Sequence, residues 1–146
     1  MRLGLALGVL LLSAGAAEAA SCSVSDASLS LGVIDPAAGA AVPSSGIINV
    51  TCSFGAAYAV GLNNGANASG GVRRLKHGSS SSYLAYELYK TPLLSARFGD
   101  AVVSERASEI GLGIAANPVA VYATVPSGQT APAGPYGDQV RITVYF

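Results

Sequence analysis

The chain has 146 residues, which is room for one domain and too few for a second core. Lys plus Arg and Asp plus Glu each number 8, so the formal net charge is zero, and 11% of the residues are charged, against about 25% in typical soluble domains. A nucleic-acid-binding protein carries a clear basic excess, so the composition excludes that class. Such a weakly charged surface is poorly protected against self-association and suits a chain that works inside an assembly.

The N-terminal segment has the three parts of a secretory signal peptide. Arg2 supplies the positive charge, residues 3–12 are an apolar run, and Ala17-Glu18-Ala19 matches the small-x-small cleavage rule. We expect a signal peptide over residues 1–19, removed after Ala19 or Ala20, and a mature domain over residues 20–146. A retained membrane anchor and a lipoprotein with its lipid on Cys22 are the alternatives. The uncharged stretch is shorter than the roughly 20 residues of a spanning helix, and the expected Leu three residues before Cys22 is missing.

The mature domain contains two cysteines, Cys22 and Cys52. An even number of cysteines in a secreted chain predicts a disulfide. The bond would close a loop that removes on the order of 3–4 kcal/mol of freedom from the unfolded chain. Two cysteines with one histidine, His77, do not make a metal site, so we expect no metal and no other cofactor.

Strand signals dominate the mature chain, because apolar residues alternate with a period of two in short runs. The alternating runs are residues 29–33, 48–54, 58–62, 84–88, 119–125 and 140–146. Turn-rich stretches separate them at residues 36–46, 65–71, 78–82 and 127–137, and Asn63-Asn64-Gly65 predicts a hairpin-type turn. Residues 100–110 are the one place where a short helix could form. The pattern predicts an all-β, immunoglobulin-like β-sandwich held by one disulfide.

The last run continues to the final residue. Val140, Ile142, Val144 and Phe146 alternate with polar or aromatic residues and would face inward. An apolar edge strand is normally covered or blunted. We therefore expect an incomplete sandwich, with these four residues lining a groove that needs a strand from elsewhere.

Three tyrosines lie in the run around residue 86. Tyr86 should belong to the core, whereas Tyr83 and Tyr89 face the other way, and Glu87 also points outward. Outward tyrosines usually pack across strands. Contact with a sugar or a partner is the alternative.

No constellation in the chain predicts an enzyme. His77 adjoins a serine-rich stretch where we expect it to be solvated, and there is no G-x-S-x-G motif. Residues 111–116 match G-x-G-x-x-A, but Asn117-Pro118 would stop the helix that nucleotide binding requires, so a loop is expected. The carboxylates of residues 100–109 accompany Arg97 and Arg106, which predicts a charge-paired loop.

Five segments together resemble the spore coat protein U family, the domain of archaic chaperone–usher pilins. The segments are Cys22 with LGVIDP, GIINVTC ending at Cys52, RRL followed by YLAYELY, VYATVPSGQ, and PAGPYGDQVRITVYF at the C-terminus. They span residues 22–146. The resemblance implies a subunit whose open edge is covered by a periplasmic chaperone and then by a strand from another pilin subunit. It also implies passage through an outer-membrane usher, the one contact with a membrane, to a fimbrium at the cell surface.

One departure from the family bears on mechanism. Polymerising pilins of this kind carry an extension ahead of the first cysteine, and this extension fills the groove of the next subunit. Cleavage after Ala19 would leave Ala20-Ser21 before Cys22, which is shorter than a strand. We therefore expect a subunit that accepts a strand without giving one, located at the pilus tip with a role in adhesion or biofilm formation. The alternative is a self-sufficient secreted spore-coat or surface-binding module.

Tyr136 and Asp138 are expected to shape the turn into the last strand. Pro135 and Gly137 flank Tyr136. The arrangement resembles a tyrosine corner, in which the hydroxyl hydrogen-bonds to nearby backbone.

Overall fold

The computed structural model describes residues 18–25, 27–39 and 41–146, so most of the predicted signal peptide lies outside the described residues. Within this part of the chain there are eleven strands and two short 3-10 helices, Pro36–Ala38 and Val103–Glu105. The strands are β1 (Cys22–Val24), β2 (Val33–Ile34), β3 (Val42–Cys52), β4 (Ala57–Leu62), β5 (Arg74–His77), β6 (Tyr83–Ala85), β7 (Glu87–Tyr89), β8 (Ala107–Ile110), β9 (Asn117–Val125), β10 (Gly134–Gly137) and β11 (Ile142–Tyr145).

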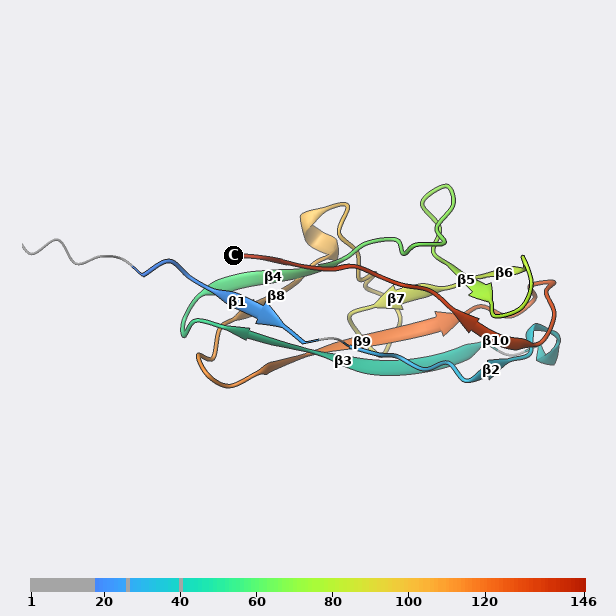
Figure 1. Ribbon diagram of the computed structural model, residues 1–146, viewed down its shortest axis with the longest axis horizontal. Helices are drawn as coiled ribbons and strands as arrows, with labels where there is room; N and C mark the ends of the chain where they lie inside the picture. Colours follow the sequence, from blue (N-terminus) through green and yellow to red (C-terminus); the bar gives the residue numbers. More distant parts are fainter. Residues whose placement is uncertain (1–17, 26, 40) are drawn as a thin grey trace, which may run out of the picture.

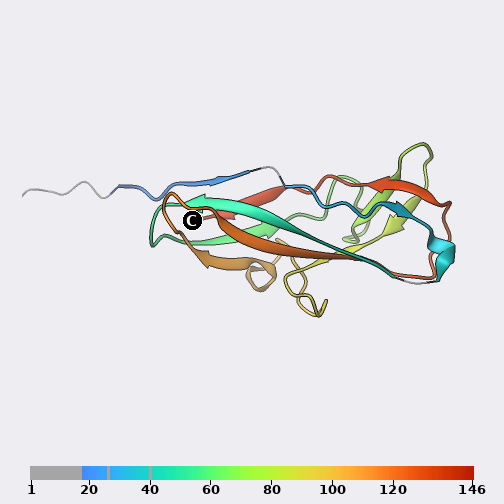
Figure 2. The ribbon, with the colours of Figure 1, turned by 90° about the horizontal axis from the view of Figure 1, so that it is seen from below.

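The strands form an elongated sandwich (Figure 1). One sheet has the order β1-β3-β9-β7, and its β3–β9 ladder runs from Val42↔Val125 to Val50↔Asn117. Two smaller sheets, β11-β4-β8 and β2-β10-β5-β6, complete the structure. The turned view in Figure 2 shows β3 and β9 side by side along the length of the domain. The predicted all-β, immunoglobulin-like sandwich is confirmed.

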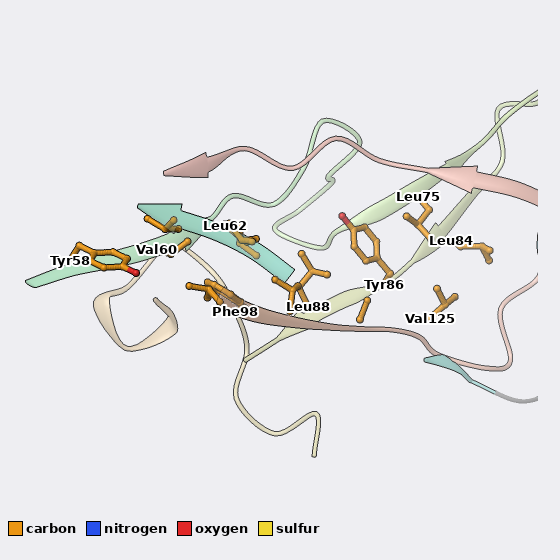
Figure 3. Packing of buried hydrophobic residues seen from close by; sticks show 14 of the residues in the cluster. Tyr58, Val60, Leu62, Leu75, Leu84, Tyr86, Leu88, Phe98 and Val125 are labelled. Carbon is orange, nitrogen blue, oxygen red and sulfur yellow. The ribbon is translucent and has the colours of Figure 1, made fainter. Parts of the chain in front are cut away.

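The core is a row of apolar side chains between the sheets (Figure 3). The runs predicted to face inward supply most of it. Its buried members are Ile34, Ile48, Val50, Cys52, Tyr58, Val60, Leu62, Leu75, Leu84, Tyr86, Leu88, Phe98, Val119, Val121, Ala123 and Val125. Each fully buried large apolar side chain contributes about 1.5–3 kcal/mol, so this row is the main source of stability.

The disulfide joins β1 to β3. Cys22 and Cys52 are direct partners in the ladder between these strands and form a bond, as predicted. Ser53 extends the pairing, because its backbone N–H donates to the carbonyl of Ser21 at 2.9 Å. The first strand is thereby fixed to the edge of its sheet.

Strand β3 is longer at its start than predicted, and it ends earlier. It begins at Val42, inside the stretch expected to be a loop, because β9 provides a partner from Val42 to Val50. It ends at Cys52, so Phe54 is 86% exposed instead of inward-facing. The chain turns at Gly55, whose φ of 74° is accessible to glycine at little cost.

The predicted hairpin at Asn63-Asn64-Gly65 was wrong. Strands β4 and β5 do not pair with each other; β4 pairs with β11 and β8, and β5 pairs with β10 and β6. Gly65 does adopt the positive φ, at 85°, that the motif indicated. The intervening chain leaves the sheet as a loop, visible above β5 in Figure 1.

Residues 100–110, where a short helix was expected, hold one 3-10 turn followed by β8. Strand β8 forms because it pairs with β4, from Ala57↔Ile110 to Val60↔Ala107, so tertiary pairing overrides local preference. The predicted charge pairing around this segment is confirmed. Arg97 contacts Glu105 at 2.9 Å, and Arg106 contacts Asp100 at 3.1 Å.

A buried arginine, which the sequence did not indicate, holds the end of β4. The side chain of Arg73 has no exposed surface, and its guanidinium donates to the carbonyls of Leu62 at 2.8 Å and of Asn63 at 2.8 and 3.1 Å. These carbonyls lie where the chain leaves the sheet. Arg73 therefore satisfies backbone acceptors that would otherwise be buried without a partner.

Glu87 balances the charge of Arg73. It was expected to face solvent, yet it is half-buried and forms ion pairs with both Arg73 and Arg97. Burial disfavours the charged carboxylate, but hydrogen bonds from Arg97, the Leu88 backbone and Arg73 outweigh this and lower the pKa of Glu87 below 4.5. The stability from this depressed pKa is present at neutral pH and is lost as the pH falls through the folded-state value.

We predict that Arg73→Met reduces the free energy of unfolding by about 3 kcal/mol, because it leaves carbonyls and a carboxylate without their buried partner. Arg74→Met is the matched control. Arg74 lies over the ring of the exposed Tyr83 and donates one hydrogen bond to the Asn67 carbonyl, so its loss should cost no more than about 1 kcal/mol. Urea denaturation measures both, and equal effects would contradict the assigned role of Arg73.

Candidate functional site

A groove of about 380 Å³ lies beside the C-terminal segment. One wall is formed by residues 27–32, and the other by residues 136–142. The floor belongs to the core and is lined by Leu62, Leu75, Tyr86, Leu88 and Val121. The groove therefore lies directly above apolar side chains of the core.

The C-terminal wall is paired along one edge. Strand β11 pairs with β4, and within the described ranges no strand pairs with its other edge. The pairing continues before β11, where Asn63 N–H donates to the Arg141 carbonyl at 3.1 Å and Ala66 N–H donates to that of Gln139 at 2.9 Å. Backbone groups alternate in direction along a strand, so the peptide groups of Val140 and Ile142 face the unpaired edge.

The opposite wall also has free backbone. Across the part of the chain that the structure describes, residues 27–32 make no backbone–backbone hydrogen bonds. A side chain holds this wall instead: the Ser44 hydroxyl donates to the carbonyl of Ser30 at 2.7 Å. Gly46 allows the close approach, since a Cβ there would lie 3.3 Å from the Ser28 carbonyl oxygen. Both walls can therefore offer hydrogen bonds to an added strand.

The four residues expected to line a groove are not all brought to it. Val140 and Ile142 line it, and Val144 is partly buried against the core beyond its end. Phe146 is 63% exposed and lies outside it. Their role in accepting a strand stays a prediction.

Tyr136 and Asp138 continue the inward-facing row of Val140 and Ile142, and both line the groove. The Tyr136 hydroxyl donates to the carbonyl of Pro132 at 2.6 Å. The sequence pattern predicted a turn at these residues and did not indicate their position on the wall. Extending the period of two backwards from Val140 would have found it.

Asp138, Tyr86 and Asn67 form a hydrogen-bonded cluster where the C-terminal wall meets the floor of the groove. The Tyr86 hydroxyl points toward the C-terminal segment in Figure 3 and donates to Asp138 Oδ2 at 2.8 Å. Asp138 Oδ1 accepts from the backbone N–H and the side-chain amide of Asn67, at 3.1 and 2.9 Å. Burial, followed by the hydrogen bond to Asp138, raises the pKa of Tyr86 well above its ordinary value.

His77 is buried rather than solvated, so that expectation was wrong. It is 9% exposed, and its ring meets the ring of Tyr136 edge to face with centroids 4.9 Å apart. The Ser79 backbone N–H donates to its Nδ1 at 3.2 Å. The contacts of His77 support the end of the groove, and the histidine belongs to strand β5 rather than to the serine-rich loop.

The described residues contain no group of three or more His, Cys, Asp or Glu side chains that could hold a metal ion. None of their helices is long and apolar enough to cross a membrane.

The chain is matched by a family model as well as by individual proteins. Residues 8–143 match the model of the Spore Coat Protein U domain. The chain belongs to this family. Protein U of Myxococcus xanthus is similar to the domain, with 31% identity over 120 residues, covering 78% of this chain and 66% of that protein.

A solved structure extends the comparison. It is the crystal structure of the CsuC–CsuE chaperone–tip adhesion subunit pre-assembly complex from archaic chaperone–usher Csu pili of Acinetobacter baumannii. One of its chains matches this Spore Coat Protein U domain with a TM-score of 0.59 and 26% identity, over 88% of the domain's chain. The match spans 40% of that other chain, which is therefore considerably longer.

The raised pKa of Tyr86 predicts a pH effect. The folded state keeps this phenol protonated above pH 10, where the unfolded state loses the proton, so stability falls as the pH rises. Tyr86→Phe should reduce this dependence above pH 10 by about 1.4 kcal/mol per pH unit, the effect of one proton. Urea denaturation between pH 9 and 11.5 measures the slope, and an unchanged slope would show that Tyr86 is not the group responsible.

Tyr136→Phe tests the hydroxyl that binds the Pro132 carbonyl. The substitution removes one hydrogen bond and keeps the ring against His77, so it should cost about 1 kcal/mol. Thermal denaturation followed by circular dichroism measures the change. No loss of stability would mean that the hydroxyl does not hold the entry to the last strand.

Proposed function

We propose that this domain is a structural subunit of a secreted chaperone–usher pilus and that its groove accepts a β-strand from a partner. The observation that carries the proposal is the unpaired edge beside an apolar floor. An added strand gains main-chain hydrogen bonds from the edge and specificity from pockets for alternate side chains. Val140 and Ile142 contribute to the hydrogen bonds, since their peptide groups face the unpaired edge. They also contribute to specificity, since their side chains line the groove.

The proposed partners are a periplasmic chaperone, an outer-membrane usher and other pilin subunits. The similarity to a chain of a chaperone–subunit complex supports the first and the last of these. The predicted signal peptide over residues 1–19 would direct the chain to the periplasm, and the usher would export the mature domain, residues 20–146, to a fimbrium at the cell surface. The chaperone strand would fill the groove before assembly, and a subunit strand would replace it.

We place the subunit at the pilus tip, with a role in adhesion or biofilm formation. The solved relative contains a tip adhesion subunit, which supports this position. The predicted cleavage after Ala19 also supports it, because Ala20 and Ser21 alone would then precede Cys22. Two residues are too few to form a donor strand.

A self-sufficient secreted coat or surface-binding module is the second candidate, and membership of the Spore Coat Protein U domain family favours it. Such a module would fold without help. The stability of the mature domain on its own therefore separates the two candidates.

The decisive prediction concerns a strand fused after Phe146 through a flexible linker. A seven-residue strand with Val at inward positions and Thr at outward positions should bury three or four apolar side chains. At about 1.5–3 kcal/mol each, less the entropy of ordering the strand, the gain should raise the melting temperature on the order of 10 °C. Differential scanning calorimetry of the mature domain with and without the fusion measures it.

The matched control is a strand of similar composition with the inward and outward residues exchanged. It keeps the length and β-propensity but presents hydroxyls to the floor, so it should raise the melting temperature much less. A mature domain that is monomeric, melts cooperatively at high temperature and gains nothing from either fusion would support the self-sufficient module instead.

A further inference from the structure

Asp138 is an acidic residue in an otherwise mostly apolar groove. It sits in the inward-facing row between Tyr136 and Val140, above a floor of Leu75, Tyr86 and Leu88. Its carboxylate oxygens accept hydrogen bonds from three neutral donors, two on Asn67 and one on Tyr86. Within the described part of the chain it has no ion pair.

The buried cation near this region, Arg73, already has its ion-pair and hydrogen-bond partners. Arg73 binds Glu87 and the carbonyls at the end of β4. Asp138 is partly buried, and the groove is one of the surfaces through which water can reach it. A strand that fills the groove would remove this water. Burying a carboxylate beside apolar side chains is unfavourable unless a donor or a cation compensates it.

We propose that the strand accepted by the groove carries a hydrogen-bond-donating side chain, preferably cationic, at the inward position that meets Asp138, with apolar residues at its other inward positions. This inference rests on the proposed function and adds the chemistry of the partner strand. The contact between this cation and Asp138 would also set the register of the added strand in the groove. A shift by two residues would place the cation against Tyr136 or Val140 and return Asp138 to an apolar partner.

The test uses the mature domain with the fused Val/Thr strand, in which each inward Val is replaced by Lys in turn. We expect Lys to lower the melting temperature by roughly 5–10 °C at every inward position but one. At the position that faces Asp138, the melting temperature should match or exceed that of the Val strand. In the Asp138→Asn domain the same Lys should lose its advantage, while the effects at the other positions stay unchanged.

A second series leaves the domain unaltered, so it does not depend on how well Asp138→Asn folds. At the position identified by the Lys scan, the melting temperature should fall in the order Lys, Thr, Met, Glu, with Lys the highest. Charge and donor capacity, rather than side-chain length, should decide this order. Equal losses with Lys at all inward positions, or a favoured position unaffected by Asp138→Asn, would overturn the inference. Failure of every fused strand to stabilise the domain would instead reject the proposed function.

Discussion

The last strand of the sandwich is hydrogen-bonded along one edge, and the functional interpretation depends on that edge. Strand β11 and the residues before it pair with β4 and its continuation, while the peptide groups of Val140 and Ile142 face the groove. Unpaired backbone beside an apolar floor is a template on which another strand can pair. The Spore Coat Protein U domain thus combines a buried core with an unpaired strand edge beside a groove.

The surrounding contacts keep this boundary in place. The Cys22–Cys52 disulfide fixes β1 to β3, so the first strand is attached before the chain enters the opposite wall. Arg73 and Glu87 stabilise the end of β4, the partner of the last strand. Asn63 links the two regions, since its carbonyl accepts from Arg73 and its side chain accepts from the Arg141 N–H. A groove held by such contacts is preorganised, which reduces the entropy that strand binding must overcome.

Alternation of apolar residues predicted the sandwich and most of its core, because inward and outward positions follow directly from the period of a strand. Tyr58, Val60 and Leu62 are buried as that period requires. The same alternation placed Val140 and Ile142 at the groove, where they lie. It also placed Phe146 there, but Phe146 lies beyond the groove. The pattern could not identify Arg73 as a buried residue, because its partners come from the end of β4 and from β7 and are defined only by the tertiary structure. Strand β8 was missed for the same reason, since its pairing with β4 decides its conformation.

Amide hydrogen exchange of the last strand, resolved by NMR, tests the central claim most directly. In the mature domain, the amides of Val140 and Ile142 should exchange much faster than those of Arg141 and Thr143, because only the latter pair face the β4 side. With an alternating strand fused after Phe146, all four amides should exchange slowly. Slow exchange of Val140 and Ile142 in the domain alone, or fast exchange that the fused strand leaves unchanged, would contradict the account.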